Sequence, residues 1–70
     1  MLYKFTTIIY KEDDWYIAKC AENIIASQGK SLDEAVENLR EAVELYYEDN
    51  EDEKPVQFNN IFISSMEVSI

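Results

Sequence analysis

The segment from residue 26 to residue 43 reads ASQGKSLDEAVENLREAV. Ser31 is a preferred helix N-cap, and Glu34, three positions later, completes a capping box. Asp33 and Glu34 also suit the positive end of a helix dipole. Apolar residues then recur at spacings of three and four, as on one face of a helix: Leu32, Ala35, Val36, Leu39, Ala42, Val43 and Tyr46. The segment predicts an amphipathic helix from about Leu32 to about Glu48.

Upstream of this helix the sequence predicts three strands. Leu2–Tyr10 and Trp15–Cys20 are rich in β-branched and aromatic residues, and the polar Lys11–Asp14 between them favours a turn, so the two segments should form a β-hairpin. Ile24–Ser27 is predicted as a short third strand. Gly29, the only glycine, stands just before the helix, where we expect it to supply a backbone conformation that other residues resist.

Downstream of the helix the sequence predicts an acidic loop and a fourth strand. Residues 48–53 carry five acids in six positions and lead to Pro55, which indicates a solvated loop. From Ile61 to Ile70 apolar residues alternate, as in a strand. The 70 residues should therefore form one domain, residues 1–70. Its predicted class is α+β in the order β-β-β-α-β, an antiparallel-type sheet with one helix packed on one face.

Composition excludes several classes of function. Six Lys plus Arg against fifteen Asp plus Glu give a net charge of −9, which argues against direct nucleic-acid binding, because phosphate contacts need clustered cations. With no His, the chain cannot form a Ser-His-Asp or Cys-His site, nor a zinc site with a His ligand. One Cys cannot form an intrachain disulfide and fits a reducing compartment. No apolar run is long enough to span a membrane, so we expect a cytoplasmic protein.

Candidate catalytic residues have simpler explanations. Asp13 and Asp14 or the helix carboxylates could bind Mg²⁺, but they fall in a turn and on an outer helix face, where acids are usually solvated. Cys20 could be a reactive thiol, but with no His in the chain and few basic residues nearby nothing obvious lowers its pKa, and a buried structural Cys is the more common case. The phosphate-loop-like Gln28–Ser31 lacks its upstream glycine. We therefore expect no enzyme activity, no cofactor and no metal.

A partner-binding surface is the stronger candidate. Carboxylates gather near the predicted end of the helix, where the helix dipole makes them unfavourable; we call this group the acidic helix end, and it comprises Glu44, Glu48, Asp49, Glu51, Asp52 and Glu53. It is either a solvated patch or a docking site for a basic protein. Trp15 and Tyr47 join it as candidates, because aromatic residues on an acidic chain are typical of cores and protein interfaces.

The aromatic-led strand Trp15–Cys20 and the segment Ala26–Val43, above all the Ser27-Gln28-Gly29 step into the capped helix, resemble the HicB antitoxin family. The resemblance implies a partial RNase H-like fold without RNase H catalysis. It also implies binding to a HicA-type toxin, a small basic protein that cleaves mRNA using a His. The chain would be a short stand-alone member lacking the C-terminal DNA-binding domain. It departs from the family at Glu12–Asp14, where members usually have glycines, and at Ala21–Ile25, where they have a Pro- and Gly-containing turn.

Two functions are therefore expected first. The leading one is an antitoxin module that neutralises a HicA-type toxin by masking its RNA-binding surface. The alternative is a self-associating structural or regulatory protein with no toxin partner, and a degenerate nuclease is a third. A chain of this size buries only about 60% of its unfolded surface. We expect a homo-oligomer, most simply a dimer, that covers an open sheet edge.

Overall fold

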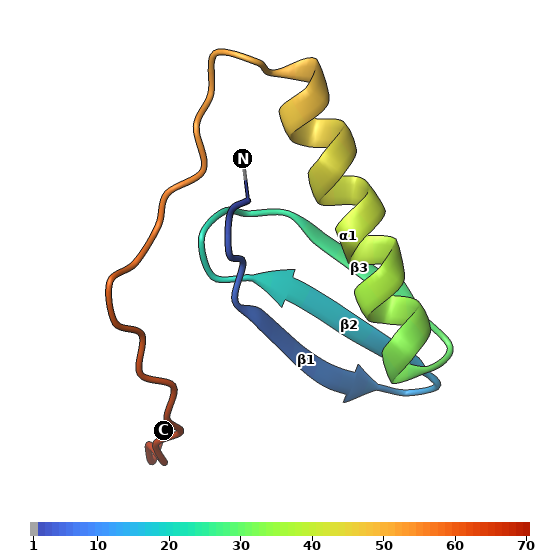
Figure 1. Ribbon diagram of the computed structural model, residues 1–70. Helices are drawn as coiled ribbons and strands as arrows, with labels where there is room; N and C mark the ends of the chain where they lie inside the picture. The colour runs from blue at the N-terminus through green and yellow to red at the C-terminus, as the bar shows by residue number, and fades with distance from the viewer. Residues whose placement is uncertain (1) are drawn as a thin grey trace.

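The computed structural model describes residues 2–70 and confirms an α+β fold of order β-β-β-α (Figure 1). Strands β1 (Thr7–Glu12), β2 (Trp15–Cys20) and β3 (Ala26–Gly29) form one antiparallel sheet in the order β1-β2-β3. Helix α1 (Leu32–Asp49) follows and packs across one face of the sheet. No helix within residues 2–70 has the length and apolar character that crossing a membrane requires.

The β1–β2 hairpin is tighter than the sequence predicted. Glu12 pairs with Trp15, so only Asp13 and Asp14 form the turn, and Lys11 and Glu12 belong to β1. At its other end β1 starts at Thr7, not at Leu2. The Glu22 carboxylate accepts a hydrogen bond from Thr6 N at 2.8 Å, while Thr6 O still accepts one from the backbone N–H of Ala21 at 2.9 Å.

The third strand lies two residues later than predicted, at Ala26–Gly29. Asn23 Oδ1 accepts a hydrogen bond from Ile25 N at 2.9 Å, which holds the preceding residues in a turn. Ile24 is fully exposed there, so it does not contribute to the sheet.

The start of α1 confirms Ser31 as the N-cap, but the side chain of Glu34 reaches the N–H of Lys30 and not that of Ser31, which a capping box requires. Ser31 Oγ accepts a hydrogen bond from Glu34 N at 3.1 Å, and Glu34 Oε1 accepts one from Lys30 N at 2.9 Å. At the other end Asn50 Nδ2 donates to Tyr46 O at 2.7 Å, so a side chain satisfies a carbonyl that the last turn leaves free. The helix is therefore fixed at both ends by local side chains.

The expectation that Gly29 supplies a special backbone conformation is wrong: its φ is not positive. Its role is a close approach between β3 and α1. A Cβ at this position would lie 2.6 Å from Ala35 N and 2.9 Å from the carbonyl carbon of Glu34. The absence of a side chain at Gly29 lets the first turn of α1 rest on the end of β3.

The core is small and lies under one side of the helix. The buried hydrophobic residues come from β2 and α1: Ala18, Cys20, Ala35, Leu39 and Val43. Helix α1 packs over β3 and β2, and β1 extends beyond it as the outer strand. One face of β1 is therefore left largely uncovered.

The predicted fourth strand is not formed in the single chain. Within residues 2–70 the last assigned element is α1, and residues 58–70, which we call the C-terminal tail, are exposed throughout. Just before the tail, Gln57 Oε1 accepts a hydrogen bond from Lys4 N at 3.1 Å, and Gln57 Nε2 donates to Lys4 O at 2.9 Å. Beyond this anchor the tail leaves the sheet (Figure 1). The alternating pattern describes an extended segment correctly, but a strand also needs a partner.

Candidate functional site

The end of α1 and the loop after it bring the acidic helix end together. Tyr46 donates from its hydroxyl to Glu53 Oε2 at 2.7 Å, and Glu53 N donates to Asn50 O at 3.0 Å. These two bonds fold the loop back against the last turns of the helix. The carboxylate of Glu53 raises the pKa of Tyr46, because it accepts the phenol's proton in a hydrogen bond.

No carboxylate of the acidic helix end forms an ion pair in the part of the chain that the structure describes, although Lys54 lies close to Glu44, Glu51 and Glu53. There, one ion pair is present, Arg40 with Glu37 at 3.0 Å, and both side chains are exposed. Three lysines lie over aromatic rings instead: Lys11 over Tyr16, Lys19 over Tyr10 and Lys30 over Trp15. The negative potential of the helix end is therefore left to the solvent or to a partner.

A pocket of about 210 Å³ opens beside these carboxylates, and we call it the acidic pocket. Glu44, Glu51 and Glu53 contribute its acidic groups. The remaining lining residues are mostly aromatic or apolar: Tyr3, Phe5, Val43, Tyr47, Pro55 and Lys54. A pocket with apolar walls and carboxylates suits the long stem and charged head of a Lys or Arg side chain.

Tyr47 lies at this pocket and is half-buried. Its ring centroid is 5.8 Å from that of Phe5, and its hydroxyl accepts a hydrogen bond from Asn23 Nδ2 at 3.3 Å. Tyr47 therefore forms part of the pocket wall and also packs against the core. The other residues of the acidic helix end divide as follows: Asp49 and Asp52 line a second, polar hollow with Glu51 and Glu53, and Glu48 lines neither.

Trp15 lies elsewhere in the molecule. Lys30 Nζ is 3.9 Å from the centre of its ring, which places Trp15 near the start of α1. The 18 residues of α1 separate the two ends of the helix by about 27 Å. Trp15, Ile8 and Tyr10 are partly exposed on the face of the sheet that points away from α1. The structure therefore does not bring Trp15 to the acidic helix end.

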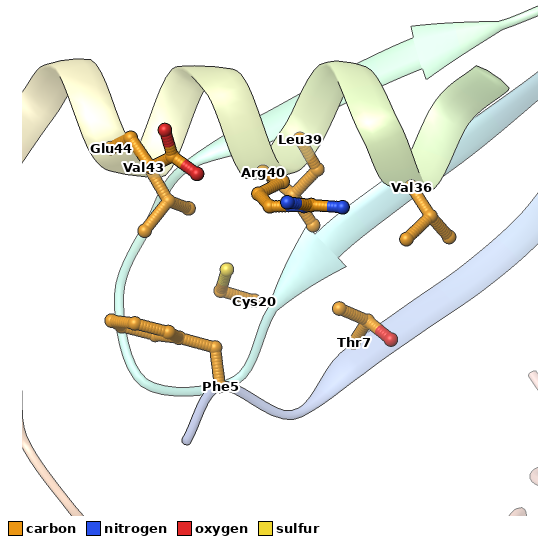
Figure 2. A pocket seen from close by; sticks show the side chains of 8 residues that line it. All are labelled: Phe5, Thr7, Cys20, Val36, Leu39, Arg40, Val43 and Glu44. Atoms are coloured by element: carbon orange, nitrogen blue, oxygen red, sulfur yellow. The ribbon is translucent and has the colours of Figure 1, made fainter. Parts of the chain in front are cut away.

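A third hollow, which the sequence did not reveal, is an apolar groove between α1 and β1. Val36, Leu39 and Val43 point from the helix toward Phe5, Thr7 and Cys20, with Arg40 and Glu44 completing the lining (Figure 2). The groove measures about 260 Å³. The apolar stripe of the helix could not reveal it, because the groove depends on α1 lying over β2 and β3 and not over β1.

Cys20 is at the floor of this apolar groove and is almost fully buried. Burial raises the pKa of its thiol, the nearby charge of Glu22 raises it further, and a hydrogen bond with Asn23 acts in the opposite direction. The thiol is therefore held in its neutral, less nucleophilic form, as expected for a structural cysteine. Among residues 2–70, no group of three or more Cys, Asp or Glu side chains is arranged to hold a metal ion.

A comparison with known protein families identifies a match over most of the chain. A family model described as "Family of unknown function (DUF7387)" matches residues 5–68. The matched span contains all four elements and most of the C-terminal tail. No curated protein and no solved structure matches the chain.

Proposed function

The chain belongs to the family of unknown function DUF7387, and from its surfaces we propose that it is a protein-binding module that captures a basic protein at the acidic helix end. The resemblance to HicB antitoxins makes the proposal more specific. The partner is a HicA-type toxin, and binding neutralises it by masking the surface with which it holds RNA.

The acidic pocket is the observation that supports this proposal most directly. It offers carboxylates from Glu44, Glu51 and Glu53 next to the rings of Phe5 and Tyr47. An RNA-cleaving protein needs exposed Lys and Arg to contact phosphates. One such side chain in the acidic pocket would place its stem on the rings and its charge on the carboxylates, and it would then be hidden from RNA.

The fold is compatible with the resemblance as far as α1. The order β-β-β-α is the one that the resemblance implies for these elements. The close approach at Gly29 also gives a steric reason for the Ser27-Gln28-Gly29 step. These two points support the resemblance in fold, whereas the acidic pocket supports the binding of a basic side chain.

The test is binding of a HicA-type toxin whose catalytic His has been replaced by Ala. We expect the double variant Glu44→Gln/Glu51→Gln to associate about tenfold more slowly at low salt, and to lose much of the salt dependence, because steering depends on these charges. Stopped-flow mixing at two NaCl concentrations measures both effects. The matched control is Glu12→Gln/Asp14→Asn, which removes the same charge at the hairpin.

The result has two clear outcomes. Loss of rate in the pocket variant but not in the control supports the proposal. Equal behaviour of both variants, or no binding of the unmodified chain to the toxin, contradicts it. If the proposal is contradicted in either way, the alternative becomes the better explanation: a self-associating protein without a toxin partner. The apolar groove favours this alternative.

A further inference from the structure

We propose that the C-terminal tail of one copy pairs with the free edge of β1 in a second copy and fills its apolar groove, so that two chains exchange tails. The exchange does not depend on the toxin proposal. It rests on three features of residues 2–70: an apolar tail that packs on nothing in this part of the chain, an open apolar groove, and a strand edge beside that groove with no partner strand there.

The tail has the side-chain pattern of a strand that buries one face. Phe62, Met66, Val68 and Ile70 alternate on one side with Ser64, and the opposite side carries Ile61, Ile63, Ser65, Glu67 and Ser69. In the single chain Phe62 is 91% exposed and Met66 is 87% exposed. Large side chains that are exposed in this regular pattern mark a surface that another surface covers.

The receiving site has matching chemistry. Within residues 2–70 strand β1 pairs with β2 alone, so in this part of the chain no other strand occupies its outer edge, and that edge can bind an added strand. Beside this edge the apolar groove presents Phe5, Val36 and Val43 (Figure 2). The six residues of β1 span about 20 Å, which the ten residues from 61 to 70 can cover in extended form.

The path of the chain favours a second copy over the chain's own tail. Gln57 is held at Lys4, next to the start of β1, yet the tail then leaves the sheet and the apolar groove stays open. Figure 1 shows the tail running away from the three strands toward its end. A tail that extends away from its own sheet is free to bind the β1 edge of another molecule.

Charge permits the approach of two such acidic molecules. Each chain has a net charge of −9, so most of their surfaces repel each other. Glu67 is the one charged residue among the thirteen residues of the tail. It is therefore a segment that can enter the groove of a second copy at little electrostatic cost.

Sedimentation velocity on the full chain tests the proposal. We expect a dimer at micromolar concentrations, and a Kd weakened on the order of a hundredfold by Phe62→Asp/Met66→Asp, because these substitutions place charges on the row that enters the groove. The control Ser65→Asp/Ser69→Asp adds the same charge to the opposite row and should keep the dimer. In the groove, Val36→Asp should dissociate the dimer and Leu45→Asp, on the exposed helix surface, should not.

A mixing experiment separates exchange from closure within one chain. One sample is the variant Cys20→Ala/Ser65→Cys with a spin label on the new cysteine. It is mixed with a second sample, chains enriched in ¹⁵N that carry no spin label. Broadening of the amide signals of Thr7 and Val36 in the enriched chains supports exchange, since the label is on the other copy. A monomer at all concentrations, a dimer that tolerates the groove and tail substitutions, or broadening only when label and isotope share one chain would overturn the proposal.

Discussion

Gly29 joins the sheet to the helix through contact of backbone with backbone. A Cβ there would meet Ala35 N at 2.6 Å and atoms of Glu34 at 2.9 Å. Backbone atoms of a capped helix cannot rotate aside as a flexible side chain can, so Gly29→Ala should lower the free energy of unfolding by about 1–3 kcal/mol. Urea denaturation measures the change. The neighbouring control Gln28→Ala should stay within about 0.5 kcal/mol of the unmodified chain, and an equally small effect at Gly29 would show that the approach is not tight.

The β1–β2 hairpin stores strain in its two-residue turn. Asp13 has φ 55°, and it is the one non-glycine residue with a positive φ in the described chain. A positive φ at the first central residue is typical of turns that prefer glycine at that position. We expect Asp13→Gly to stabilise the protein by up to about 1 kcal/mol, because the left-handed conformation costs an L-residue about that amount.

Thermal and urea unfolding check this prediction. Asp14→Gly is the matched control, since it removes the same charge at a residue without positive φ. It should bring no gain, because glycine also adds freedom to the unfolded chain. A gain for Asp14→Gly equal to that for Asp13→Gly would assign the effect to charge and not to backbone strain.

The whole molecule is dominated by repulsion between like charges. With a net charge of −9 and Arg40–Glu37 as the ion pair found within residues 2–70, added salt should screen more repulsion than attraction. The free energy of unfolding should therefore rise between about 0.01 M and about 0.15 M NaCl, where the Debye length falls from about 30 Å to about 8 Å. Urea denaturation at several salt concentrations measures it.

The opposite sign is expected for binding to a basic partner, which salt should weaken. Glu48→Gln/Asp49→Asn, which removes two charges from the acidic helix end, should flatten the dependence of stability on salt. Stability that falls as NaCl is added would contradict the view that unpaired carboxylates dominate this chain.

Elements with local signals can be predicted from the amino-acid sequence alone. Helix α1 follows from the Ser31 cap and a stripe with helical spacing, and β2 follows from a run of aromatic and β-branched residues; both agree with the structure. The gathering of acids near the helix end could also be read from the sequence, because Glu44 to Glu53 are neighbours along the chain. Interactions between close neighbours depend little on the rest of the fold.

Features that depend on contacts between distant residues could not be predicted in this way. The contacts between distant residues place the start of β1 at Thr7, give Gly29 a steric role, hold Trp15 far from the acidic helix end and leave the apolar groove beside β1. Residues 61–70 also remain without the strand that their alternation predicts. The physical reason is that an extended segment becomes a strand only when another backbone satisfies its N–H and C=O groups, and alternation specifies the segment but not that partner.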